Sequence, residues 1–267
     1  MAYNDNGIME YKYLNVTRSD AVVMVQLNRP EKRNALSDGV VAELRHCFES
    51  IDQNIKAAVI SGNGDHFCAG LDLSELSERN SSQGVYHSRS WHKALDCIQF
   101  GTVPVVAALH GAVVGGGLEL ASSCHIRVAD ASTFYALPEG SRGIFVGGGG
   151  SVRIPKLIGV ARMTDMMLTG RSYSAQEGER VGLSQYLVDT GSALSKAIEL
   201  ASRIAQNASM TNYALMHGLP RIAEQASDHG YFTEALLASI AQDSPDAKER
   251  VKAFLAGKAA KVQAPKV

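Results

Sequence analysis

Two glutamates near the middle of the chain lie close in sequence to runs of glycine. Glu119 follows the cluster Gly115–Gly117, and Glu139 precedes the run Gly147–Gly150. Adjacent glycines let a backbone approach a ligand closely, and at a helix start they leave free N–H groups that favour a negatively charged oxygen. Two carboxylates can divide proton removal and proton delivery between them. Together these residues indicate acid–base chemistry on a group whose oxygen gains negative charge.

Each glutamate also has an ordinary structural explanation. A carboxylate in the first turn of a helix, where Glu119 is expected, is stabilised by the helix dipole. Glu139 follows Pro138, and both residue types are favoured at a helix start. Neither glutamate is informative alone, and their joint placement beside glycine-rich turns is what favours a catalytic interpretation.

A third element, His66–Leu73 (HFCAGLDL), comes directly after a predicted buried strand and its turn. Its Ala69-Gly70 pair either supplies a second backbone donor for an oxyanion or simply permits tight packing. Histidine is a common catalytic base, but nothing near His66 in the sequence marks it as one.

The elements that must position these residues alternate between strands and helices. Apolar, β-branched runs predict strands over 21–27, 57–60 and 105–109, and Ser37 is expected to cap a helix after the first of them. This alternation predicts an α/β fold with a mostly parallel sheet.

The rest of the chain is divided by its pattern. The polar segment 74–92 is interpreted as a loop followed by a helix start, forming a mobile lid whose Tyr86, Trp91 and His92 either pack or contact a substrate. From residue 161 onward the periodicity is helical. We therefore expect an α/β core over 1–200 and a helical C-terminal region over 201–267.

Composition excludes several classes of function. The chain has 267 residues, 45% of them hydrophobic, and a formal net charge of -1, which gives no general attraction to nucleic acid or to an anionic membrane. Its four cysteines lie far apart and no His cluster has metal-ligand spacing, so neither a disulfide framework nor a metal site is expected. With no apolar run long enough to span a membrane and no targeting pattern, the sequence predicts a cytoplasmic protein.

The three motifs in this order, together with Asn28–Leu36 (NRPEKRNAL), resemble the crotonase, or enoyl-CoA hydratase/isomerase, superfamily over about residues 13–254. The resemblance implies a crotonase-like spiral of ββα units with a helical C-terminal trimerisation region. It also implies a homotrimer or a dimer of trimers, and an acyl-CoA as the substrate. The activity it implies is that of an enoyl-CoA hydratase.

The resemblance also assigns roles to individual residues. The backbone N–H groups of Leu71 and Gly116 would form an oxyanion hole for the thioester oxygen, with Glu119 mainly activating water and Glu139 mainly protonating the alpha carbon. No metal or redox cofactor is implied, because coenzyme A enters as part of the substrate.

Binding of coenzyme A is implied for a further set of residues on two loops. They are Lys32, Arg33, Ala35, Ala69 and Leu71. Surface lysines and arginines are usually just solvated, which is the competing explanation for the two basic residues.

The sequence departs from the family pattern at two places. Cys124-His125 stands where many members have Cys-Asp, and Ile144–Gly150 replaces the usual proline-containing turn. The first departure either changes packing only or alters the hydrogen bonding behind the site. The second affects the geometry that holds water and the acyl group.

Other functions remain open from sequence alone. An enoyl-CoA isomerase, or another crotonase-type lyase or hydrolase, would use the same enolate, although an isomerase can work with one carboxylate whereas this chain has two. A catalytically silent binding protein is a second class, against which the absence of a Lys/Arg-rich helix argues in the case of RNA. A dinucleotide enzyme is disfavoured because Gly115–Gly117 does not fit G-x-G-x-x-G.

Overall fold

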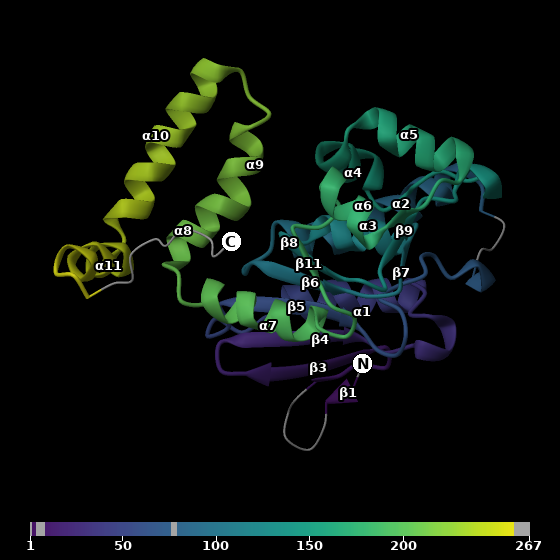
Figure 1. The fold of residues 1–267 in the computed structure, drawn as a ribbon, viewed down its shortest axis with the longest axis horizontal. Helices are drawn as coiled ribbons and strands as arrows, with labels where there is room; N and C mark the ends of the chain where they lie inside the picture. The colour runs from purple at the N-terminus through teal and green to yellow at the C-terminus, as the bar shows by residue number, and fades with distance from the viewer. Residues whose placement is uncertain (1, 4–8, 76–78, 259–267) are drawn as a thin grey trace. The chain divides into compact units, whose positions relative to one another are not determined.

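The computed structural model describes residues 2–3, 9–75 and 79–258 (Figure 1). It divides the chain into two compact units, Met1–Ala205 and Gln206–Val267. The boundary predicted between residues 200 and 201 falls inside helix α7 (Ala193–Ile204), which belongs wholly to the first unit.

A six-stranded sheet is the centre of the first unit, with the strand order β11-β8-β6-β5-β4-β3. Its strands β3 and β4 form an antiparallel hairpin, and every other neighbouring pair is parallel. The strands are β3 (Leu14–Ser19), β4 (Val22–Leu27), β5 (Ala57–Gly62), β6 (Val105–Leu109), β8 (Ile126–Asp130) and β11 (Tyr186–Val188). The three predicted strands are therefore confirmed.

The remaining strands form two smaller sheets. In the three-stranded sheet, β9 (Phe134–Ala136) lies between β7 (Ala112–Val114), to which it is parallel, and β10 (Tyr173–Ser174), to which it is antiparallel. The strands β1 (Ala2–Tyr3) and β2 (Met9–Glu10) form an antiparallel pair.

Helices and short 3-10 turns connect the strands of the first unit. The 3-10 turns are η1 (Pro30–Lys32), η2 (Leu73–Glu75) and η3 (Gly140–Arg142). Besides α7, the helices are α1 (Asp38–Glu49), α2 (Ser81–Gln99), α3 (Gly116–Ser123), α4 (Gly150–Ile158), α5 (Val160–Thr169) and α6 (Ala175–Val181). Ser37 caps α1 as predicted, since its side chain accepts a hydrogen bond from Val40 N.

Apolar side chains cover both faces of the large sheet. On one face, Ala197, Leu200 and Ala201 of α7 pack on Val59 and Val106 of the central strands. On the other face, a larger core holds the buried sides of α1, α2 and α3 together. The buried strands β5 and β6 thus read as continuous apolar runs because neither of their faces meets water.

The prediction of a loop followed by a helix start over 74–92 is confirmed, because α2 begins at Ser81, where Asn80 and Gln83 form a capping box. Residues 76–78 of the expected lid lie outside the described residues. The prediction that the chain after residue 161 is helical is wrong in part. That part of the chain also supplies β10 and β11, strands of two and three residues that are too short to show a period of two.

The second unit is helical. It consists of α8 (Ser209–Tyr213), the π turn η4 (Ala214–Gly218), α9 (Leu219–Ile222), α10 (Ser227–Asp243) and α11 (Pro245–Leu255). Within this unit α10 contacts α8, α9 and α11. Among the helices of both units, over the part of the chain that the structure describes, none is long and apolar enough to cross a membrane.

Candidate active site

Helix α3 starts on glycine and carries Glu119 in its first turn. Gly115 has a φ of 52°, and its N–H donates to the carbonyl of Ala136, which ties the helix start to β9. Only glycine adopts such a backbone conformation readily, so the sharp turn from β7 into α3 depends on it. The helix is buried along its whole length, and Glu119 is 4% exposed.

The glycine run expected near the site holds the Glu119 carboxylate directly. The N–H groups of Gly148 and Gly150 each donate to Glu119 Oε1 at 2.8 Å. Burial raises the pKa of Glu119, while these two amides and then the positive charge of Arg153 oppose that rise. The carboxylate is thus desolvated, but its ionised form has fixed partners.

Glu139 lies at the start of η3 and approaches the same helix start. A Cβ placed on Gly115 would lie 2.8 Å from Glu139 Oε1, so glycine is what allows the carboxylate this close to α3. Among the described residues, the buried Glu139 Oε2 has no hydrogen-bond partner. Burial raises the pKa of Glu139, and the neighbouring charge of Glu119 raises it further. The structure therefore brings the two predicted carboxylates into one electrostatic environment.

The two predicted oxyanion-hole amides also come together. Leu71 forms an isolated parallel bridge with Leu36, and Gly70 before it has a φ of +99°. A Cβ placed on Gly116 would lie 3.3 Å from Leu71 N, and one placed on Gly70 would lie 3.4 Å from Gly116 N. Two glycines therefore let the segment around Leu71 approach the N-terminus of α3.

An ion pair and hydrogen bonds hold the Leu71 segment in place. Asp72 is buried and binds the Arg29 guanidinium at 2.9 Å, and its N–H donates to the carbonyl of Leu36. Hydrogen bonding from the Ser74 hydroxyl, and then the Arg29 guanidinium, lower the pKa of Asp72 to about 2. Asp72 therefore stays ionised at ordinary pH and keeps its ion pair with Arg29. This ion pair and the hydrogen bond to Leu36 fix the backbone next to Leu71.

The residues predicted to bind coenzyme A lie on adjoining loops. Ala69 N donates to the carbonyl of Arg33 at 3.0 Å, which joins the loop after η1 to the Leu71 segment. Ala35 is buried, whereas Lys32 and Arg33 are exposed. The arrangement presents two basic side chains to solvent beside the candidate site. Their positive charge would favour binding of an anionic phosphate group there.

Trp91 of α2 lies against two parts of the site, the glycine run at Gly148 and the start of α3 at Gly116. The sequence left open whether this side chain packs or contacts a substrate. Its ring would be 3.2 Å from a Cβ on Gly148 and 3.3 Å from a Cβ on Gly116, and the side chain is 4% exposed. Its buried Nε1 has no hydrogen-bond partner among the described residues. Tyr86, one turn and more before it, is 76% exposed. Among the aromatic residues of the segment 74–92, Trp91 is thus one that packs against the candidate site.

Sequence reasoning also missed Arg153 and the two amides that bind Glu119. Arg153 is buried on α4, three residues after the end of the glycine run. The glycine run itself could have indicated the two amides, because successive glycines at a helix start expose N–H groups that can bind an anion.

The two histidines that stood out in the sequence have structural partners. His66 Nδ1 accepts the N–H of Ala112 at 3.2 Å. At the departure from the family pattern, His125 Nδ1 accepts the N–H of Val105, and its Nε2 lies 3.0 Å from the carbonyl of Gln99. The second contact requires the proton on Nε2. His125 therefore forms hydrogen bonds to two backbone groups, and an aspartate carboxylate at this position could not donate the second of them.

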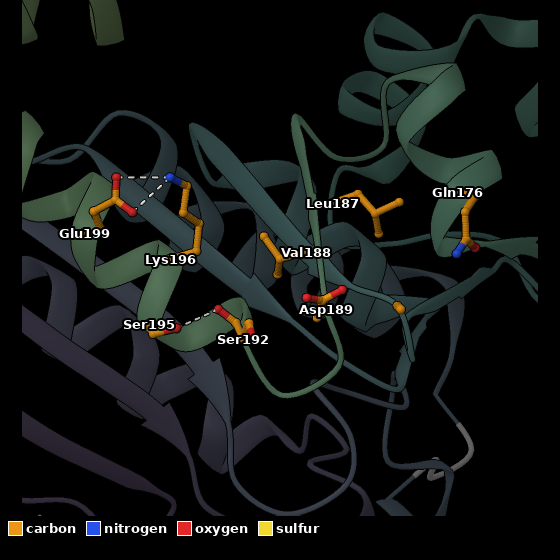
Figure 2. Close-up of a pocket in the computed structure, with 9 residues that line it drawn as sticks. Gln176, Leu187, Val188, Asp189, Ser192, Ser195, Lys196 and Glu199 are labelled. Carbon is orange, nitrogen blue, oxygen red and sulfur yellow. Dashed lines mark hydrogen bonds and ion pairs between the residues drawn. The ribbon is translucent and has the colours of Figure 1, made fainter. Parts of the chain in front are cut away.

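A surface pocket of about 690 Å³ lies elsewhere in the first unit, between α6, β11 and α7 (Figure 2). Lys196 and Glu199 lie side by side on α7 and form an ion pair at 2.9 Å, and Ser195 donates to the carbonyl of Ser192. These polar groups satisfy one another, and neither glutamate of the candidate site lines the pocket. The pocket offers no arrangement suited to the predicted chemistry.

Known proteins resemble this chain over most of its length. The enoyl-CoA hydratase/isomerase family matches residues 17–262. The 2,3-dehydroadipyl-CoA hydratase of Escherichia coli (strain K12) is 32% identical over 244 residues, which cover 90% of this chain and 94% of the relative.

Solved structures show the same fold. A protein of Rhodopseudomonas palustris CGA009 assigned as an enoyl-CoA hydratase has 59% identity and a TM-score of 0.90, covering 92% of this chain and 95% of its own. An enoyl-CoA hydratase of Bacillus anthracis has 29% identity and a TM-score of 0.86, with 92% and 97% covered. The predicted crotonase-like α/β fold is thereby confirmed. The chain belongs to the enoyl-CoA hydratase/isomerase family of the crotonase superfamily, and it is an enzyme, a hydro-lyase of that family.

Proposed function

We propose that this enzyme adds water across the double bond of a 2-enoyl-CoA thioester, with Glu119 and Glu139 as its catalytic residues. The observation that carries the proposal is the pair of buried carboxylates at one helix start, whose pKa values both depart upward from the ordinary glutamate range. Two such groups can take and give a proton in one reaction.

The two carboxylates differ in a way that suits different roles. Glu119 Oε1 accepts two amide N–H groups, which favour its ionised form and leave Oε2 as the oxygen that can accept a proton from water. Glu139 has no such donors on its buried Oε2, and the nearby charge of Glu119 favours its protonated form. Glu119 is therefore the better base and Glu139 the better acid.

In the reaction we propose, the amides of Leu71 and Gly116 bind the thioester oxygen as it gains enolate charge. Water loses a proton to Glu119 while its oxygen bonds to the beta carbon, and the alpha carbon takes a proton from Glu139. The pair returns to its starting state when Glu119 passes the proton that it took from water to Glu139, so atoms and charge balance over one turnover. Each oxyanion donor is expected to lower the barrier by roughly 3 kcal/mol.

The same proposal covers the substrate's other end and the assembly. Lys32 and Arg33 would bind coenzyme A phosphates, beside the backbone of Ala35, Ala69 and Leu71. The protein would be a homotrimer or a dimer of trimers in the cytoplasm and would need no cofactor beyond the coenzyme A of its substrate. These points remain predictions.

The experiment follows the ultraviolet absorbance of the conjugated enoyl thioester. The panel holds short, medium, branched and aromatic 2-enoyl-CoAs, and also 2,3-dehydroadipyl-CoA, because the Escherichia coli relative is named for it. We expect wild-type protein to remove the absorbance with at least one class. Glu119→Gln and Glu139→Gln should each lower the rate by about 10²- to 10⁴-fold, since each removes one proton-transfer group.

The control is Glu179→Gln, on the exposed side of α6, which should react like wild type. A folded, fully active Glu139→Gln variant would refute the two-carboxylate scheme. Failure with every 2-enoyl-CoA, combined with a rise in absorbance on adding a 3-enoyl-CoA, would replace hydration by isomerisation.

A further inference from the structure

The Arg153 guanidinium connects helix α2 to the glycine loop of the site. Its Nε donates to Gln99 Oε1 at 2.6 Å and its Nη2 to Asp96 Oδ1 at 2.7 Å, both on α2. Its Nη1 donates to the carbonyl of Gly148 at 2.9 Å. Arg153 is 8% exposed, so these bonds are what compensate for burying its charge.

A second side chain of α2 fixes the peptide that precedes Gly148. Ser88 Oγ donates to the carbonyl of Gly147 at 2.5 Å. That carbonyl and the N–H of Gly148 belong to one planar peptide, and the N–H donates to Glu119 Oε1. Ser88 and Arg153 therefore hold two successive carbonyls of the loop whose amides bind the glutamate.

The loop needs such contacts because it consists of glycine. Four successive glycines have no side chains to pack and the greatest backbone freedom of any sequence. Gly149, in the middle, has a φ of +97°, and a Cβ there would lie against the Arg153 guanidinium. The order of this backbone thus depends on groups that reach it from outside.

We propose that Arg153, assisted by Ser88, is a positioning residue that fixes the Gly148 and Gly150 amides and, through them, the Glu119 carboxylate. The inference rests on the proposed function of Glu119 as the group that activates water. Arg153 need not touch the substrate; it acts through the loop and through its charge.

The charge gives the proposal a signature that a purely structural role lacks. The positive charge of Arg153 lowers the pKa of Glu119 against the effect of burial. If Arg153→Met removes that charge, the pKa of Glu119 rises, and the ionised base is lost at a higher pH as the solution is acidified. The acidic limb of the kcat profile then moves toward higher pH. Arg153→Lys keeps a charge but loses the three-way geometry, so it should lower kcat with a smaller movement of the limb.

Other titratable groups face this cluster and must be separated from it. Glu139 faces Glu119 from η3, while Asp96 and His92 of α2 and Cys124 after α3 interact with Arg153. The pKa of His92 is lowered, first by burial and then by nearby arginines, so a His92→Gln variant is titrated in parallel.

The experiment measures kcat, KM and the pH profile of the full-length wild type, Arg153→Met, Arg153→Lys, Ser88→Ala and the control Arg162→Met. Arg162 is exposed on α5, where it donates to the carbonyl of Ile158. We expect Arg153→Met to lower kcat on the order of 10- to 100-fold with KM little changed. Ser88→Ala should lower kcat and move the limb less than Arg153→Met does, because it loosens one amide of the loop but removes no charge.

A measurement without substrate separates this inference from the proposed function. The pKa of Glu119 is followed by NMR in ¹³C-glutamate-labelled free protein, with Glu119→Gln identifying the resonance. A higher pKa of Glu119 in Arg153→Met than in wild type supports the positioning role of Arg153. It does so even if the wild type hydrates no enoyl-CoA, a result that would contradict the proposed function alone. An unchanged pKa in a folded Arg153→Met variant, with kcat no lower than in Arg162→Met, would overturn the inference.

Discussion

At the scale of single residues, Glu139 shows a conflict between stability and activity. Its carboxyl is 6% exposed and one oxygen has no hydrogen-bond partner among the described residues. Ionising such a group in the folded protein is unfavourable, which is why its pKa is raised by burial and by Glu119. A residue retained in this state is expected at a functional site, because a neutral side chain of the same shape would be more stable there.

This conflict predicts that Glu139→Gln stabilises the fold while it depresses activity. A raised folded pKa means that the stability present at low pH is lost as the pH rises through that pKa. The glutamine side chain of the variant never ionises, so the variant escapes this loss, and its free energy of unfolding near pH 7 should exceed that of wild type by roughly 1 kcal/mol. Thermal melts from pH 4 to pH 8 check the sign.

The difference between the two proteins should vanish toward pH 4, where the wild-type carboxyl is increasingly protonated in both states. Glu179→Gln, which alters an exposed glutamate, should show no such pH-dependent gain. A Glu139→Gln variant that is less stable than wild type at pH 7 would contradict the view that its burial is unfavourable.

At the scale of elements, the close approach of α4 to α3 places the loop amides on Glu119. A Cβ on Gly150, at the start of α4, would lie 2.8 Å from Glu119 Cγ and 2.9 Å from its Oε1. That is closer than real side chains approach one another, so either α4 or the carboxylate must shift. The absence of a side chain at this position is therefore a requirement of the site.

We predict that Gly150→Ala lowers kcat on the order of 100-fold, because about 1 Å of displacement at a catalytic group is enough for that effect. Steady-state kinetics with circular dichroism as a check on folding test this. The matched control is Gly84→Ala in α2, where a Cβ would meet nothing within 4 Å. That change should leave kcat alone and stabilise the helix by about 0.5–1 kcal/mol. Equal activity of the two variants would contradict the packing argument.

At the scale of the whole molecule, the C-terminal unit exposes much apolar surface on its own. Large apolar side chains at least half exposed occur on its helices and are more numerous than an isolated helical unit in water tolerates. Helix α10 is apolar on more than one side, which is typical of a helix that is covered on several faces. These side chains are Tyr213, Leu215, Leu219, Tyr231, Phe232, Leu236, Ile240, Val251, Phe254 and Leu255.

This surface favours association with further copies, and the family resemblance implies their number, so we predict that the protein in solution has the mass of three or six copies of the 28.5 kDa chain. Leu236→Glu places a charge on α10 and should shift the assembly toward smaller species, whereas Glu234→Gln on the same helix should not. Sedimentation velocity measures both. A wild-type protein that sediments as a monomer at micromolar concentration would contradict the expected trimer.

The sequence by itself determined those features that depend on neighbouring residues. The strands β4, β5 and β6 were readable because buried parallel strands are runs of apolar residues, and Ser37 marked a helix start because a cap acts within one turn. The glycines and glutamates pointed to an oxyanion and a proton-transfer pair for the same reason, since each glycine cluster and its glutamate lie near one another in the chain.

Only the tertiary structure decided how those pieces meet. That Gly148 and Gly150 bind one oxygen of Glu119, that Trp91 lies against both site loops, and that Arg153 ties the glycine run to α2 are contacts between segments far apart in sequence. No local pattern encodes such contacts, because they arise from the packing of α2, α3 and α4 against one another. The burial of Trp91 was not readable for the same reason: residues 81–92 are polar along much of the helix, and the wall that buries Trp91 is provided by the rest of the fold.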